Sequence, residues 1–200
     1  MKLVSTPRVE YLRTLAAEIV NLNGRGRVIV AVDGADEAAR TAFADDLAAV
    51  LDEAGTPAFR ASLPYFTRSR QEQARFGADT PERHYRHGYD YSALRRVLLE
   101  PFRLGGSTAF VTQVIDPERD TWIEPDWTTG PVDAILVLDG EFLNRAELRD
   151  GWNYRILLES ETTNEADYLY QKEERPRQWV SAVIDLSDPA RPARVFSDSC

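Results

Sequence analysis

Apolar residues run without interruption from Val28 to Val32 and stop at Asp33-Gly34. A short run that is apolar on both faces predicts a buried central strand of a parallel sheet. About six residues later the pattern changes: between 40 and 53, apolar residues recur every three or four positions and acidic residues lie between them. Gly55 and Pro57 then end this helical pattern. The stretch predicts a strand, a short loop and a helix.

The same two patterns alternate along the rest of the chain. Thr6-Pro7 is a good helix start, and Asn23–Gly26 has the turn chemistry that ends the helix. Further strands are expected at 58–63, 109–115, 134–138, 154–158, 180–186 and 194–196, and further helices after Pro81, over 91–99, around 145–149 and within 163–175. Residues 64–80 and 116–131 are predicted to be loops. This alternation indicates an open α/β sandwich with a mostly parallel sheet.

Composition places the chain among ordinary globular proteins. With 200 residues, of which 43% are hydrophobic and 28% charged, a single domain over residues 1–200 is expected. The net charge of −9 makes nucleic acid and an anionic membrane unfavourable partners. The sequence has no signal-peptide or membrane-spanning pattern, and its single cysteine, Cys200, excludes an internal disulfide. We therefore expect a cytoplasmic protein, and self-association stays open.

The loop after the first buried strand has the spacing of a phosphate-binding loop. In the pattern G-x-x-x-x-G-K-[ST], backbone N–H groups and the lysine hold phosphates, and the hydroxyl ligates Mg²⁺. Gly34 and Thr41 occupy the outer positions, but Ala39 replaces the second glycine and Arg40 replaces the lysine. The candidate phosphate-binding residues are Gly34, Ala35, Asp36, Ala38, Ala39, Arg40 and Thr41.

Several later segments add to this loop. In order, residues 32–36, 40–45, 75–96, 98–101, 105–106, 138–143 and 185–192 resemble the uridine kinase-like branch of the P-loop nucleoside and nucleotide kinases. The resemblance covers nearly the whole chain. It implies a three-layer α/β/α sandwich with a mostly parallel five-stranded sheet. It also implies phosphoryl transfer from ATP, with Mg²⁺, to a nucleoside or similar small alcohol.

Two parts of the family's catalytic machinery are altered. Family members carry an aspartate directly after the second strand as the base, and Pro64, which cannot accept a proton, occupies that position. Ala39 adds a methyl group where phosphate approaches the backbone, and the planar guanidinium of Arg40 differs from a compact ammonium. No catalytic residue is therefore predicted. In one interpretation, the loop is a variant that still binds phosphate. In the other, this strand–turn–helix junction serves only the fold.

The substrate side of the family pattern is better represented. The matching residues are Arg68, Arg70, Tyr85, Tyr89 and Asp90. The two arginines also fit an interpretation as solvated charges on a loop. His87 stands where the family has an acidic residue, and His84 lies three residues before it. Without a carboxylate or cysteine cluster, the two histidines do not indicate a metal site.

The family's arginine-containing lid is expected to be missing near 159–167. The acidic stretch Glu159–Glu165 leads almost directly into Tyr168-Leu169-Tyr170, which resembles the segment after the lid. An acidic strip would repel ATP phosphates, whereas a lid clamps charge and excludes water. Asp139, after the predicted strand 134–138, is a candidate Mg²⁺ ligand together with Thr41. Its alternative is a strand-end cap.

Two functions follow from these features. The first is a relative impaired in phosphoryl transfer and kept as a ligand-binding or interaction protein, with a nucleotide or small phosphorylated ligand as candidate partner. The second is an active ATP-dependent kinase acting on a nucleoside or similar alcohol. The first is favoured because phosphate loop, base and lid are altered together.

Overall fold

The fold is built on a six-stranded sheet in the order β2-β5-β1-β6-β7-β8. The computed structural model describes residues 2–159 and 164–196. Five neighbouring strands are parallel, and β8 runs antiparallel at one edge. The strands are β1 Val28–Asp33, β2 Ala58–Ser62, β5 Ile135–Gly140, β6 Tyr154–Glu159, β7 Ala182–Asp185 and β8 Ala193–Val195. The predicted mostly parallel sheet is confirmed, but the expected five strands are joined by a sixth, the antiparallel edge strand β8.

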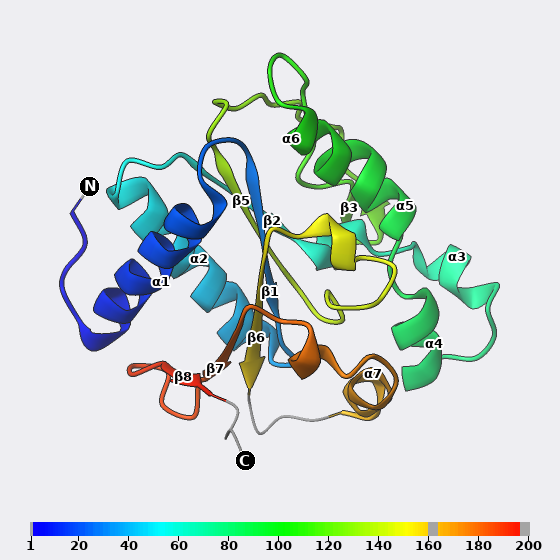
Figure 1. Cartoon of the computed structure of the whole chain (residues 1–200). Helices are drawn as coiled ribbons and strands as arrows, with labels where there is room; N and C mark the ends of the chain where they lie inside the picture. Colours follow the sequence, from blue (N-terminus) through cyan, green and yellow to red (C-terminus); the bar gives the residue numbers. More distant parts are fainter. Residues whose placement is uncertain (1, 160–163, 197–200) are drawn as a thin grey trace.

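Helices cover both faces of this sheet (Figure 1). Because side chains alternate along a strand, β1 contributes to the core on both faces of the sheet. Val28, Val30 and Val32 pack with α1 and α2 on one face. Ile29 and Ala31 pack with the helices on the other face. The helices are α1 Pro7–Asn23, α2 Glu37–Glu53, α3 Arg70–Ala74, α4 Pro81–His87, α5 Tyr91–Leu94, α6 Glu100–Leu104 and α7 Glu165–Glu174. The architecture is a three-layer α/β/α sandwich.

The strand predicted over 109–115 is wrong. Only Ile115–Asp116 forms a strand, β3, which pairs with β4 (Thr121–Trp122) in a separate antiparallel ribbon. The preceding residues are apolar for another reason, since the ring of Phe110 packs edge-on against Phe59 and Phe102. Periodicity alone does not distinguish such a buried irregular segment from a buried strand.

Two other predicted segments also need correction. The expected loop over 64–80 contains a 3-10 turn, Leu63–Phe66, and the helix α3. The helix expected around 145–149 is a series of turns that ends in the 3-10 turn Arg149–Gly151. A π-helical turn, Arg95–Leu99, joins α5 to α6. Within the ranges 2–159 and 164–196, no helix has the length and apolar character that crossing a membrane requires.

Gly140, at the end of β5, allows the close approach of the segment that follows β2. A Cβ atom at Gly140 would lie 2.5 Å from the Cβ atom of Leu63. Gly140→Ala is therefore expected to lower the free energy of unfolding by about 1–3 kcal/mol, the usual cost of overpacking. Urea denaturation measures this loss, with Gly151→Ala as the control because its nearest contact would be an ordinary 3.5 Å. Equal losses in the two variants would contradict the prediction.

Candidate functional site

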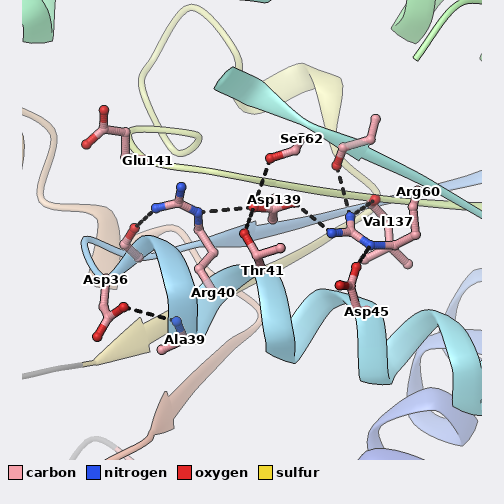
Figure 2. Close-up of polar contacts among 12 residues, drawn as sticks. Asp36, Ala39, Arg40, Thr41, Asp45, Arg60, Ser62, Val137, Asp139 and Glu141 are labelled. Carbon is pink, nitrogen blue, oxygen red and sulfur yellow. Dashed lines mark hydrogen bonds and ion pairs between the residues drawn. The ribbon is translucent and has the colours of Figure 1, made fainter. Parts of the chain in front are cut away.

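The loop after β1 is shorter than a phosphate-binding loop. Helix α2 already begins at Glu37, so Ala38 to Thr41 are helical and only Gly34, Ala35 and Asp36 connect strand to helix. Asp36 caps the helix, and its side chain accepts a hydrogen bond from the backbone N–H of Ala39 at 3.0 Å (Figure 2). A carboxylate thus takes one of the N–H groups that a phosphate would need at this helix end.

Arg40 points back into the protein rather than toward a ligand. Its side chain is buried, with the residue only 2% exposed. One terminal nitrogen donates to the Gly34 carbonyl oxygen at 2.5 Å, and Nε donates to Asp139 Oδ2 at 3.3 Å (Figure 2). Both contacts hold the charge within the loop. The guanidinium that stands in place of the family's lysine therefore stabilises the loop and the end of β5.

Asp139 is the centre of this polar network. The residue is fully buried, and it accepts hydrogen bonds at both carboxylate oxygens. Arg60 donates to Oδ1 at 2.8 Å, while Thr41 and Ser62 donate to Oδ2 at 3.1 and 3.2 Å (Figure 2). With Arg40, two guanidinium groups and two hydroxyl groups surround one carboxylate. Such a pairing compensates for the large cost of burying the charge.

These contacts do not suit a magnesium ion at Asp139. Mg²⁺ prefers carboxylate and water oxygens in octahedral geometry, but both Asp139 oxygens already accept hydrogen bonds, and two positive guanidinium groups would repel the cation. Among the described residues, no group of three or more His, Cys, Asp and Glu side chains is placed to hold a metal. Thr41 and Asp139 as metal ligands stay a prediction of the sequence, and the geometry argues against it.

Arg60 is a member of the network that the sequence reasoning missed. It lies in the middle of β2, where its guanidinium also donates to the Val137 carbonyl oxygen at 2.7 Å and to Asp45 Oδ1 at 2.8 Å. The signal was an arginine inside a predicted strand of a buried sheet. A charge at such a position requires a partner, and the carboxyl end of β5 next to β2 supplies it.

A cavity of about 800 Å³ lies beside this network. Its wall includes Thr41, Ser62 and Pro64, so it adjoins the carboxyl ends of parallel strands, where α/β proteins bind ligands. Pro64 lies in the 3-10 turn after β2 and brings no ionisable group to the wall. Pro64, which occupies the position of the family's catalytic base, therefore lines the cavity without offering a proton acceptor.

The predicted substrate-side residues divide into two groups. Arg68, Arg70 and Tyr89 line the cavity. Tyr85 instead lies in the core, 1% exposed, with its ring centroid 5.1 Å from that of Phe142. Asp90 caps α5 by accepting a hydrogen bond from the backbone N–H of Ala93 at 2.9 Å. The structure therefore brings only part of the predicted set together at the cavity.

The cavity wall also carries His84, Tyr89 and Glu141 as one hydrogen-bonded cluster. Tyr89 donates to Glu141 Oε1 at 2.6 Å, and His84 Nε2 hydrogen bonds to the same oxygen. The hydrogen bond and charge of Glu141 raise the pKa of His84. Burial acts to raise the pKa of Glu141, but the contact with His84 holds it below its ordinary value. The sequence analysis assigned no role to His84 or Glu141, which lie 57 residues apart.

The lid prediction, near 159–167, includes residues 160–163, which lie outside the described ranges. Strand β6 ends at Glu159, α7 begins at Glu165, and residues 160–163 between them are not described. Glu159 forms an ion pair with Arg177, which follows α7. The missing lid stays a prediction.

Solved structures with a similar fold include proteins that are named as kinases. A "possible uridine kinase" from Bacillus stearothermophilus aligns with a TM-score of 0.75 and 20% identity over 88% of this chain and 96% of that protein. A "putative fructose transport system kinase" from a Silicibacter species aligns at 0.63 and 18%, covering 83% and 90%. D-glycerate 3-kinase from Cryptococcus neoformans aligns at 0.51 and 12%, covering 85% and 77%.

These likenesses establish the fold of the chain. No protein-family model matches the sequence, and no curated protein matches it. The fold expected from the resemblance to uridine kinase-like proteins is confirmed, because the three similar structures share it across most of the chain. The chemistry must be argued from the site itself, since one fold supports many activities.

Proposed function

We propose that this protein binds a small molecule in the cavity of about 800 Å³ and does not transfer the phosphoryl group of ATP. The observation that carries the proposal is the inward position of Arg40, whose buried guanidinium contacts the Gly34 carbonyl oxygen and Asp139. A working phosphate loop needs free backbone N–H groups and an available cation. Here the capping carboxylate of Asp36 accepts from one of those N–H groups, that of Ala39, and the internal pairing of Arg40 occupies the cation.

The cavity supports the binding half of the proposal. Its wall offers hydrogen-bonding groups of both kinds, such as the carboxylate of Glu141, the guanidinium of Arg68 and the amide of Gln73. The names of the similar kinases refer to uridine, fructose and glycerate, each of which carries at least two hydroxyl groups. A hydroxylated small molecule therefore fits better than nucleic acid or a membrane surface, which a net charge of −9 disfavours.

A thermal-shift assay tests the loss of ATP binding. Millimolar ATP·Mg²⁺ is expected to leave the melting temperature of the wild type unchanged, whereas a ligand at 100 times its Kd adds about 2.7 kcal/mol and raises it visibly. Arg40→Ala is the matched variant, and we expect it to melt lower and to be equally indifferent to ATP·Mg²⁺. A shift in the wild type that disappears in Arg40→Ala would contradict the proposal, as would ATP consumption that depends on an added nucleoside.

The same assay examines the cavity with a panel of nucleosides, sugars and hydroxy acids. A ligand of this class is expected to raise the melting temperature without ATP, and Glu141→Gln is expected to reduce that effect. Asp133→Asn, an exposed residue that does not line the cavity, is the control. If no member of the panel stabilises the wild type at millimolar concentration, the binding half of the proposal is wrong.

A further inference from the structure

A second, smaller cavity of about 390 Å³ is lined by the Gly34–Ala35 loop, the end of β6 and helix α7. In the sheet, β6 lies on one side of β1, and β5, which carries Asp139, lies on the other. The residues that line it differ from those of the larger cavity. Two of them, Asp33 and Asp167, are carboxylates that are only 1% and 6% exposed. Buried carboxylates without full compensation are costly, so their partners need to be identified.

Asp33 is held in one orientation by contacts to a single oxygen. The backbone N–H and the side-chain amide of Asn144 donate to Oδ2 at 3.1 and 2.7 Å, and the Tyr170 hydroxyl donates to the same atom. No described residue donates to Oδ1. Asp33 also lines the cavity. Among the described residues, the carboxylate is therefore fixed through one oxygen, and the other is left as the acceptor for a ligand in the cavity.

Asp167 contributes a second acceptor from helix α7. Its only side-chain contact among the described residues is a hydrogen bond of 3.3 Å that Oδ1 accepts from the Gln171 amide. The cation at the cavity wall, Arg177, is paired with Glu159. Burial raises the pKa of Asp33 to about 6 and also raises the pKa of Asp167. In both cases burial disfavours the charged form. The charge of Arg40 offsets part of this effect at Asp33. The charge of Glu141 adds to it at Asp167.

We propose that this cavity binds a small organic amine, whose ammonium group donates hydrogen bonds to Asp33 Oδ1 and Asp167. An ammonium group has three N–H donors and the charge that two desolvated carboxylates lack. A phosphate or carboxylate ligand would be repelled. No group of three or more His, Cys, Asp and Glu side chains in the part of the chain that the structure describes is placed to hold a metal ion. The inference does not depend on whether ATP binds.

Isothermal titration calorimetry tests this site with methylammonium chloride and 1,4-diaminobutane as probes. Butane-1,4-diol, with the same chain length and no charge, is the control ligand, and magnesium chloride is the control cation. Saturable binding of one amine, without comparable binding of the diol or Mg²⁺, is the expected result. Absence of saturable amine binding at millimolar concentration would overturn the proposal, and so would diol or Mg²⁺ binding as tight as that of the amine.

Three variants locate the amine. Asp33→Asn and Asp167→Asn keep the side-chain shape and are each expected to weaken amine binding about tenfold or more, equivalent to about 1.4 kcal/mol. Ala35→Phe fills the cavity from its loop side without changing a charge, and it is expected to weaken binding as well. Asp133→Asn, an exposed position that does not line the cavity, is expected to bind like the wild type. If folded Asp167→Asn and Ala35→Phe both bind the amine with wild-type affinity, the assignment is wrong.

Discussion

Asp139→Leu is expected to lower the free energy of unfolding by about 3–5 kcal/mol, the usual result of removing one partner of a buried ion pair. The carboxylate accepts hydrogen bonds from two guanidinium groups and two hydroxyl groups. Arg40, with 3% of its side chain exposed, cannot turn to solvent without opening the loop, whereas Arg60 is 24% exposed. The main loss therefore comes from Arg40. Urea denaturation followed by tryptophan fluorescence measures it.

A double-mutant cycle shows whether the loss comes from this pair. Arg40→Met removes the stranded charge, so the double variant Arg40→Met/Asp139→Leu is expected to be more stable than the sum of the single losses predicts, by about 0.5–3 kcal/mol. Asp133→Asn, which is exposed, should change stability by no more than about 0.5 kcal/mol. If Asp139→Leu costs less than about 1 kcal/mol, the carboxylate is not a structural centre and the interpretation as a metal ligand regains weight.

The fold could be predicted because its main signals are local. The run Val28–Val32 became a central strand, buried at every position of β1. Thr6 caps α1 through its side chain, with Pro7 at the first helical position, as the sequence suggests. The failed strand at 109–115 shows the limit: Phe110 is apolar because it meets Phe59 and Phe102, and contacts between distant residues leave no periodic pattern.

The start of α2 could also have been predicted more closely. Asp36 is a preferred N-cap residue, and the Glu37-Ala38-Ala39 sequence after it has strong helix formers and an acidic first turn. The hydrophobic periodicity over residues 40–53 placed the helix start about three residues later than the structure does. Periodicity marks the buried positions of a helix, whereas the cap residue marks where the helix begins.

The direction of the site's side chains could not be predicted. Arg40 meets Asp139, which lies 99 residues later in the chain, and Arg60 meets the same carboxylate from another strand. The sequence shows that each residue is charged, but only the register of β2 against β5 places Arg60 beside the end of β5. The same reason hides the contact of His84 with Glu141. A charged residue that binds a ligand and one that pairs with another charged residue of the protein are of the same type. Only the three-dimensional positions of the partners distinguish the two roles.

The unfolding free energy of Asp33→Asn is expected to increase relative to that of the wild type as pH rises from about 4 to 7. Burial, opposed in part by hydrogen bonds from Tyr170 and Asn144, raises the pKa of Asp33 from 3.8 to about 6. Below pH 3.8 the carboxyl group is protonated in both the folded and the unfolded state. Between the two pKa values the folded state binds more protons than the unfolded state, so wild-type stability falls as pH rises.

The size of this effect follows from the same values. One pKa unit corresponds to about 1.4 kcal/mol, so ionised Asp33 costs the wild type on the order of 3 kcal/mol above pH 6. Asparagine at this position keeps an oxygen acceptor without the charge, so the difference in unfolding free energy between Asp33→Asn and wild type should grow by that amount. Urea denaturation at a series of pH values measures it.

Asp185, whose pKa is lowered rather than raised, provides the control for the direction in which stability changes with pH. Hydrogen bonds from Ser187 hold the pKa of Asp185 below its ordinary value, so the wild type should gain stability relative to Asp185→Asn as pH rises. A flat difference for Asp33→Asn, or one with the same sign as that of Asp185→Asn, would contradict the burial of an under-compensated Asp33. An amine bound at Asp33 supplies the missing charge. Saturating 1,4-diaminobutane should therefore reduce the pH dependence of wild-type stability and leave that of Asp33→Asn unchanged.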